Sequence, residues 1–184
     1  MQLLSIIKRR VKSFYFSILQ QYFPKHYADL LYYWKFKKRI NWKKPKDLNE
    51  KINWLAFNTD TSEWTRLADK FAVREFVKEK GLEHILIPLI GKWDNVEDID
   101  WDKLPKQFVI RTNCGYGDTS IIYDKSSVDF DFIKERLNHA LNKRFGIESA
   151  ERHYTKIKPC IVAEKLICSN NESHYFGQLP LVDY

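Results

Sequence analysis

The sequence predicts an α+β chain, with helices in its first part and a β-rich region after them. Over residues 3–22, 48–55 and 64–72, apolar side chains recur every three or four positions, the spacing that places them on one face of a helix. Further along, short runs of β-branched and aromatic residues are separated by Gly, Asn and Asp, which is typical of strands joined by turns. A chain of 184 residues, 44% of them hydrophobic, is long enough to bury a substantial core.

Positive charge is concentrated at the front of the chain, although the whole chain carries a formal charge of only +7. Residues 1–46 hold twelve Lys or Arg side chains and a single acidic one, Asp29, for a net charge of +11. Residues 47–184 hold 19 Lys or Arg and 23 Asp or Glu, for a net charge of −4. A basic arm on a mildly acidic body predicts an anionic partner for the arm, either a membrane or a nucleic acid.

The three cysteines, Cys114, Cys160 and Cys168, favour a reducing environment. Their number is odd, and their spacing matches neither a disulfide framework nor a zinc site. We therefore expect free thiols and a cytoplasmic protein, located at the inner face of the membrane if the basic arm binds lipid.

The first predicted helix covers residues 3–22 and is amphipathic, with basic side chains largely off its apolar face. The longest charge-free run, 13–24, is too short to cross a bilayer core, which needs about 20 apolar residues. Such a helix can lie in a membrane interface or pack on the body of the protein, and both interpretations stay open. We expect no nucleic-acid partner, because its aromatic residues lie on the apolar face and not between the basic ones.

Three more helices are predicted before residue 82. The first covers 27–36, after Pro24 ends the preceding helix. The second begins near residue 48, capped by Asp47 or Asn49, with Leu48, Ile52 and Leu55 on one side. The third runs from 63 to 80 and ends at Gly81. Its apolar face is expected in the core and comprises Trp64, Leu67, Ala68, Phe71 and Ala72.

The β-rich region begins with an apolar run at 85–90, which Pro88 places at a sheet edge. Residues 108–125 then read as a strand, a small loop containing Gly115 and Gly117, and a second strand. Glycines let backbone N–H groups approach a phosphate closely, and Arg111 at the end of the first strand adds a cation. The loop is therefore a candidate nucleotide-phosphate site, although most loops of this kind are plain turns.

Acidic residues occur in Asp-x-Asp pairs, which in some glycosyltransferases hold the metal of a nucleotide sugar. The alternatives are a turn for the first two pairs and a helix cap for the third. A helix over 132–146 and a strand over 160–163 complete the predicted elements, and no established catalytic motif is found. The pairs are formed by Asp98, Asp100 and Asp102, and by Asp129 and Asp131.

Four phrases, in this order and spacing, resemble the TupA-like (teichuronopeptide biosynthesis) branch of the ATP-grasp superfamily, found in bacterial capsule and cell-wall polysaccharide loci. The resemblance covers about residues 25–184. The phrases are LNEKINWL at 48–55, ADKFAVREFV at 68–77, LPKQFVIRTNCGYG at 104–117 and IVAEKL at 161–166.

The resemblance implies a fold in which ATP lies between two α+β lobes, with Mg²⁺ as the second cofactor. It implies an amide-forming ligase, which phosphorylates a polysaccharide-linked carboxylate and passes the acyl group to an amine or amino acid. By the same resemblance, Arg111 stands where the family has a phosphate-binding Lys. The loop over the phosphates is formed by Asn113, Gly115, Gly117 and Thr119. The strand whose backbone meets adenine is represented by Glu164, Lys165 and Leu166.

The sequence also departs from the family pattern. Arg111 replaces Lys, Cys114 stands where His is common, and Tyr123 stands where a second Lys is expected. We expect these 184 residues to lack the second lobe, which in the family pattern carries the protein ligands of Mg²⁺. We therefore divide the chain into basic amphipathic helices (1–40), a mixed segment before the lobe (41–105) and a partial, first ATP-grasp lobe (106–184).

The leading hypothesis is thus an ATP-dependent carboxylate–amine ligase of surface-polysaccharide biosynthesis, inactive if this truncated chain acts alone. Two alternatives are a membrane-peripheral glycosyltransferase that uses Asp98, Asp100 or Asp102 with a metal, and a non-catalytic remnant.

Overall fold

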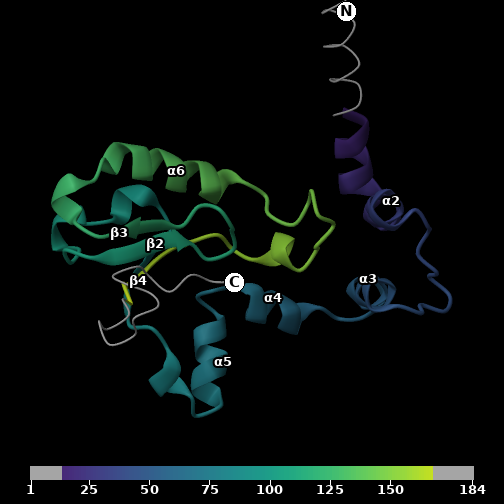
Figure 1. Ribbon diagram of the computed structural model, residues 1–184, viewed down its shortest axis with the longest axis horizontal. Coiled ribbons are helices and arrows are strands. Elements are labelled where there is room, and N and C mark those ends of the chain that lie inside the picture. Colours follow the sequence, from purple (N-terminus) through teal and green to yellow (C-terminus); the bar gives the residue numbers. More distant parts are fainter. Residues whose placement is uncertain (1–13, 168–184) are drawn as a thin grey trace, which may run out of the picture. The chain divides into compact units, whose positions relative to one another are not determined.

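The computed structural model describes residues 14–167, which form a mixed α+β structure (Figure 1). These described residues divide into two compact units, a helical one of 14–66 with 144–157, and a sheet unit of 67–143 with 158–167. The domain boundaries that the sequence predicts near residues 40 and 105 stay a prediction beside this division. Most of the predicted first helix lies outside the described residues, and its end, 14–22, is helical.

The helical unit contains α2 (Pro24–Phe36), α3 (Leu48–Asn58) and most of α4 (Ser62–Ala68). Pro24 ends the preceding helix as predicted and also begins α2, where a proline without an N–H fits the first turn. Asp47 caps α3 by accepting a hydrogen bond from the Glu50 N–H at 2.9 Å, which decides between the two predicted caps. Among the described residues, no helix combines the length and the apolarity needed to span a bilayer.

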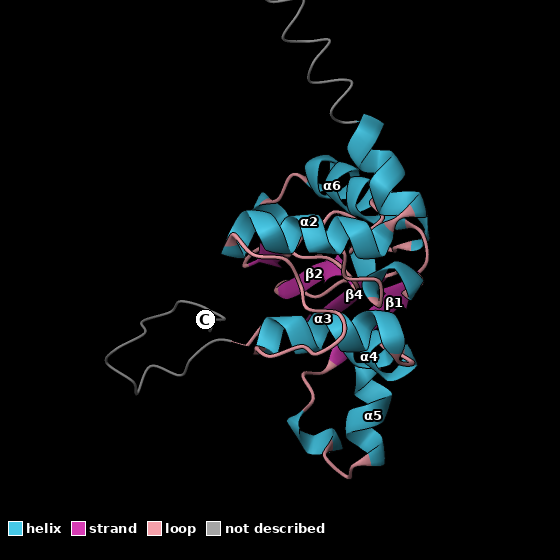
Figure 2. Ribbon diagram, turned by 90° about the vertical axis from the view of Figure 1, so that its right-hand side faces the viewer, coloured by secondary structure: helices cyan, strands magenta, loops and turns pink. Residues whose placement is uncertain are grey.

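The sheet unit is built on four antiparallel strands in the order β1-β4-β2-β3. The strands are β1 (Leu89–Trp93), β2 (Phe108–Thr112), β3 (Ser120–Ile122) and β4 (Ile161–Lys165). Figure 2 shows β2, β4 and β1 side by side. The last strand of the described residues, β4, therefore lies inside the sheet, between β1 and β2, so that its backbone is paired on both sides.

Helix α6 (Phe130–Asn142) covers one face of this sheet, as seen above β2 and β3 in Figure 1. Asp129 caps it through two backbone N–H groups, which confirms the helix-cap interpretation of that residue. Ile133 and Leu137 of α6 join Phe108 and Ile110 of β2 in the buried core, where all four are at most 5% exposed. The alternation of buried and half-buried residues along β2 fits a strand with one fully covered face.

The predicted helix over 63–80 is wrong as a single element. It is divided into α4 and α5 (Val73–Glu79) by a turn at 69–72. The cause is Asp69, whose Oδ1 accepts hydrogen bonds from the N–H groups of Phe71 and Ala72 and so begins a new helical turn. None of the five residues expected in the core on this helix is buried, because the turn breaks their common face.

Other elements are shifted. The strand predicted at 85–90 lies at Leu89–Trp93, because Pro88 precedes it, and it is an edge strand as predicted. Helix α6 ends at Asn142, before Gly146. On α3, Leu48, Ile52 and Leu55 share one side as predicted, yet all three are exposed.

Candidate functional site

The loop between β2 and β3, residues 113–119, is fixed at its start by Asn113. The Asn113 side chain accepts a hydrogen bond from the Cys160 N–H at 2.8 Å and donates one to the Lys158 carbonyl at 3.1 Å. The backbone N–H of Asn113 also donates to the Cys160 carbonyl. Asn113 is 1% exposed, so its amide is committed to the chain segment that enters β4.

The neck of the loop is closed by Asp118 and Thr112, two buried residues that hydrogen bond to each other. Gly115 lies against this pair. A Cβ atom at Gly115 would stand 2.9 Å from Thr112 Oγ1 and 3.0 Å from Asp118 Oδ1. Glycine is required there because of space, whereas Gly117 has a φ of +78° with open space around it.

Two cations hold carbonyl groups of this loop. The ammonium of Lys70 donates to the Gly115 carbonyl at 2.7 Å, and the guanidinium of Arg136 on α6 donates to the Gly117 carbonyl at 2.6 Å. In a trans peptide the N–H lies opposite the carbonyl, and none of the described peptides is cis. The N–H groups of Tyr116 and Asp118 therefore point away from the two cations.

Arg111, at the end of β2, forms a buried charge cluster with the next strand. Its guanidinium contacts one oxygen of Glu164 at 2.8 Å, and Arg74 from α5 contacts the other oxygen at 3.0 Å. Arg74 also donates to the Ile87 carbonyl at 2.7 Å. Two guanidiniums thus share one carboxylate, leaving a net positive charge, and the buried Nε of Arg111 has no hydrogen-bond partner among residues 14–167.

Lys70 is the residue that spacing arguments missed, and it lies beside both the loop and Arg111. Burial lowers its pKa, and the positive charge of Arg111 lowers it further. Its backbone N–H donates to the Asn113 carbonyl at 2.9 Å, which ties the turn after α4 to the start of the loop. The only signal for Lys70 in the sequence is the phrase at 68–77, since nothing in local spacing links it to a loop 45 residues away.

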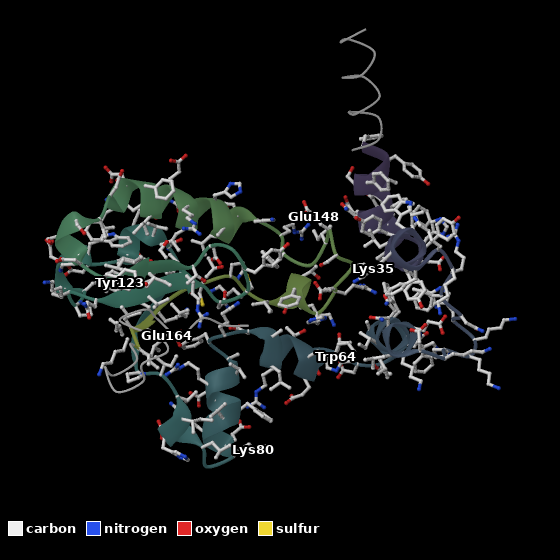
Figure 3. The ribbon with its side chains drawn as sticks, viewed as in Figure 1. Lys35, Trp64, Lys80, Tyr123, Glu148 and Glu164 are labelled. Atoms are coloured by element: carbon white, nitrogen blue, oxygen red, sulfur yellow. The ribbon has the colours of Figure 1, made fainter. Side chains whose placement is uncertain are left out.

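The remaining predicted site residues lie at the ends of β3 and β4. Thr119 is half-buried just before β3, and Lys165 is exposed at the end of β4, followed by buried Leu166. Glu164, labelled in Figure 3, is in register with Leu89 on one side and Val109 on the other. Its backbone is therefore paired within the sheet, whereas its carboxylate forms ion pairs with Arg74 and Arg111.

The acidic pairs do not gather at one point. Asp100 forms an ion pair with Lys103 at 2.6 Å, Asp98 accepts a hydrogen bond from Asn95 at 3.0 Å, and Asp129 caps α6. Within residues 14–167, no three His, Cys, Asp or Glu side chains lie close enough to hold a metal ion.

Comparison with known proteins agrees with the phrases that include the loop and the Lys70 turn. No curated protein and no solved structure matches the chain. One family model does match, that of the TupA-like ATP-grasp proteins, and it covers residues 50–175, about two thirds of the sequence. The match spans most of α3, the turn with Lys70, the glycine loop and β4, so the chain belongs to the TupA-like ATP-grasp family, whose members carry an ATP-grasp ligase kind of activity.

Proposed function

We propose that the chain binds ATP with the triphosphate at the 113–119 loop, as part of an ATP-dependent carboxylate–amine ligase of bacterial capsule or cell-wall polysaccharide biosynthesis. The observation that carries this proposal is the Lys70 ammonium, which donates to the Gly115 carbonyl of the loop and lies close enough to Arg111 to feel its charge. Cations and backbone N–H groups are what a polyphosphate needs, because its charge must be met by donors fixed in place.

The charges of the site fit an anionic ligand. Glu164 neutralises only one of its two arginines, and Lys70 has no carboxylate partner among the described residues. The Nε of Arg111 is a buried donor for which the described part of the chain offers no acceptor, an arrangement that a ligand oxygen would complete. The family pattern has a second phosphate-binding lysine at the position of Tyr123. Lys70 supplies a second cation in its place, in addition to Arg111.

The other predicted residues take the following roles in this proposal. Gly115 and Gly117 let the loop backbone approach the phosphates, and Asn113 holds its start. Thr119 lies at the far end of the loop, where its hydroxyl can face the phosphates. In this proposal the adenine meets the backbone of Leu166, which follows Glu164 and Lys165 at the end of β4.

The reaction implied by the family transfers the γ-phosphoryl group to a substrate carboxylate oxygen. An amine then attacks the acyl carbon and phosphate leaves, so that an amide forms. The substrates that we propose are a polysaccharide-linked carboxylate and an amine or amino acid. Mg²⁺ is the usual partner of such phosphates and keeps several of its waters, and we assign it no protein ligand within residues 14–167.

The glycosyltransferase alternative gains no support from the site. It needs carboxylates that face one metal ion, whereas Asp98, Asp100 and Asp129 contact Asn95, Lys103 and the start of α6. The remnant alternative, a chain that binds no nucleotide, is decided by the experiment below.

The test is a calorimetric titration of the full chain with ATP and Mg²⁺. We expect binding that weakens about 10- to 100-fold in Lys70→Met and in Arg111→Ala, because each removes a charge-assisted contact. The control is Lys103→Gln, which removes an exposed cation of the same unit. Equal affinity of the wild type and both site variants would overturn the proposed site, and absence of any nucleotide binding would favour the remnant alternative.

A further inference from the structure

Exposed aromatic rings are concentrated in the N-terminal part of the described residues. Residues 14–46 contain seven exposed aromatic side chains, whereas 47–167 contain three. Buried tyrosines on the inner side of α2, Tyr27 and Tyr32, show that this helix already has a packed face. The exposed rings are therefore additional to the core. The seven are Phe14, Tyr15, Tyr22, Phe23, Tyr33, Trp34 and Phe36.

The same stretch is strongly basic. Residues 14–46 hold eight Lys or Arg and one Asp, a net charge of +7. Arg39 and Lys38 are held by Asp29 and Asp47 at 2.6 and 2.7 Å. The others on the connection between α2 and α3 make no ion pair with described residues, and Figure 3 shows long side chains with nitrogen ends projecting outward there. These lysines are Lys37, Lys43, Lys44 and Lys46, and all are exposed.

Three cations of this stretch each lie over an aromatic ring. The Lys25 ammonium lies 4.5 Å from the centre of the Trp42 ring, and the Arg39 guanidinium lies 5.2 Å from that of Tyr33. Lys35 lies 5.6 Å from the centre of the Phe36 ring. In each pair an aromatic ring and a positively charged group lie next to each other. Residues at a membrane interface combine apolar and positive groups in the same way.

We propose that this basic–aromatic surface, formed by Tyr33, Trp34, Phe36, Lys37, Lys43, Lys44 and Lys46, docks the protein on an anionic lipid bilayer. Lysines would meet the lipid phosphates while the rings enter the headgroup region. A single-stranded nucleic acid is the other anionic partner, and it needs open ring faces on which bases can stack. Lys25 and Arg39 each occupy one face of the Trp42 and Tyr33 rings, which leaves less ring surface for stacked bases and favours the bilayer.

This docking is independent of the nucleotide site, since all its residues belong to the helical unit. The sequence predicts a location at the inner face of the membrane if the basic arm binds lipid. The proposed surface names the described residues that would make this contact. The proposal also explains why the exposed side of α2 carries rings instead of the polar residues that a solvent-facing helix usually has.

The experiment is co-sedimentation of the full chain with phosphatidylcholine vesicles, with and without phosphatidylglycerol. We expect binding only to the anionic vesicles, and weaker binding at high salt. Lys43→Gln, Lys44→Gln and Lys46→Gln together should weaken it about a hundredfold, and Tyr33→Ser with Phe36→Ser about tenfold. The matched control replaces three exposed lysines of the sheet unit by Gln: Lys80, Lys103 and Lys106.

A spectroscopic readout separates docking from a change of fold. Brominated lipid should quench tryptophan fluorescence in the wild type, and Trp34→Phe should reduce that quenching while it still sediments with vesicles. An equal loss in the control triple variant, or equal binding to neutral vesicles, would overturn the proposal. Tighter binding to a single-stranded RNA oligonucleotide than to anionic vesicles would assign the surface to nucleic acid instead.

Discussion

Asp118 closes the glycine loop by accepting two hydrogen bonds from Thr112, one from its backbone N–H at 2.7 Å and one from its hydroxyl at 2.5 Å. Both residues are buried, and the other carboxylate oxygen, Oδ1, is buried and accepts no hydrogen bond from any described residue. The six-residue separation makes this pair the neck of the loop. The loop therefore keeps its shape at the base independently of what its tip contacts.

The first prediction concerns this neck. Asp118→Asn should lower the free energy of unfolding by about 1–3 kcal/mol, because it removes a charged acceptor and buries an amide N–H₂ beside Thr112. Thr112→Val removes only the hydroxyl and should cost about 1 kcal/mol. Urea unfolding followed by circular dichroism measures both, and the double variant should cost less than the sum of the two. Full additivity would show that the two side chains do not act as a pair.

The second prediction separates the two glycines of the loop. Gly115→Ala should displace the Asp118–Thr112 pair, because its Cβ would meet Thr112 Oγ1 at 2.9 Å. Gly117→Ala meets no atom but must adopt a φ of +78°, which costs about 1–2 kcal/mol. Gly117→Asn should recover part of that loss, since Asn tolerates this backbone region better. Thermal unfolding and the amide NMR shift of Thr112 distinguish the two cases: only Gly115→Ala should move the Thr112 signal strongly.

Much of the fold could be predicted from local patterns. The α+β class, the Asp47 and Asp129 caps and the hairpin around the glycine loop all follow from signals within a few residues. The break in the 63–80 helix did not, because the apolar period continues through Asp69 and only its side chain's bonds to Phe71 and Ala72 end the helix. The place of β4 inside the sheet depends on partners about 50 to 75 residues away, which no local pattern records.

For the candidate site, the sequence pointed to the loop and to Arg111, because glycines and a strand-end cation are local features. It did not show that Arg111 would be paired with Glu164, nor that Lys70 and Arg136 would hold the carbonyls of Gly115 and Gly117. These contacts join residues separated by 19 to 53 positions. Only the tertiary structure brings them together.

The third prediction concerns Glu164, which lies between Arg74 and Arg111. Glu164→Gln should destabilise the sheet unit by about 3–5 kcal/mol, because it leaves two largely buried guanidiniums without a carboxylate. Arg111→Met should cost less, since Arg74 still neutralises Glu164. Chemical unfolding of the two variants gives the order. A Glu164→Gln variant more stable than Arg111→Met would contradict the bridging role of the carboxylate.

The fourth prediction concerns the pH dependence of nucleotide binding through Lys70. Burial, and after it the charge of Arg111, lowers the pKa of Lys70 in the free protein. A phosphate next to the ammonium would raise this pKa again, so that binding takes up a proton at any pH between the two values. Affinity should then be highest below the free-protein pKa and should fall as the pH rises through that window.

Lys70→Arg tests this directly, because a guanidinium keeps its charge at every pH of the experiment. Calorimetric titrations in two buffers of different ionisation enthalpy count the protons taken up. The wild type should take up protons at alkaline pH, and Lys70→Arg should take up fewer while it still binds ATP. An unchanged proton uptake in Lys70→Arg would show that another group titrates, and that the Lys70 ammonium does not face the phosphates.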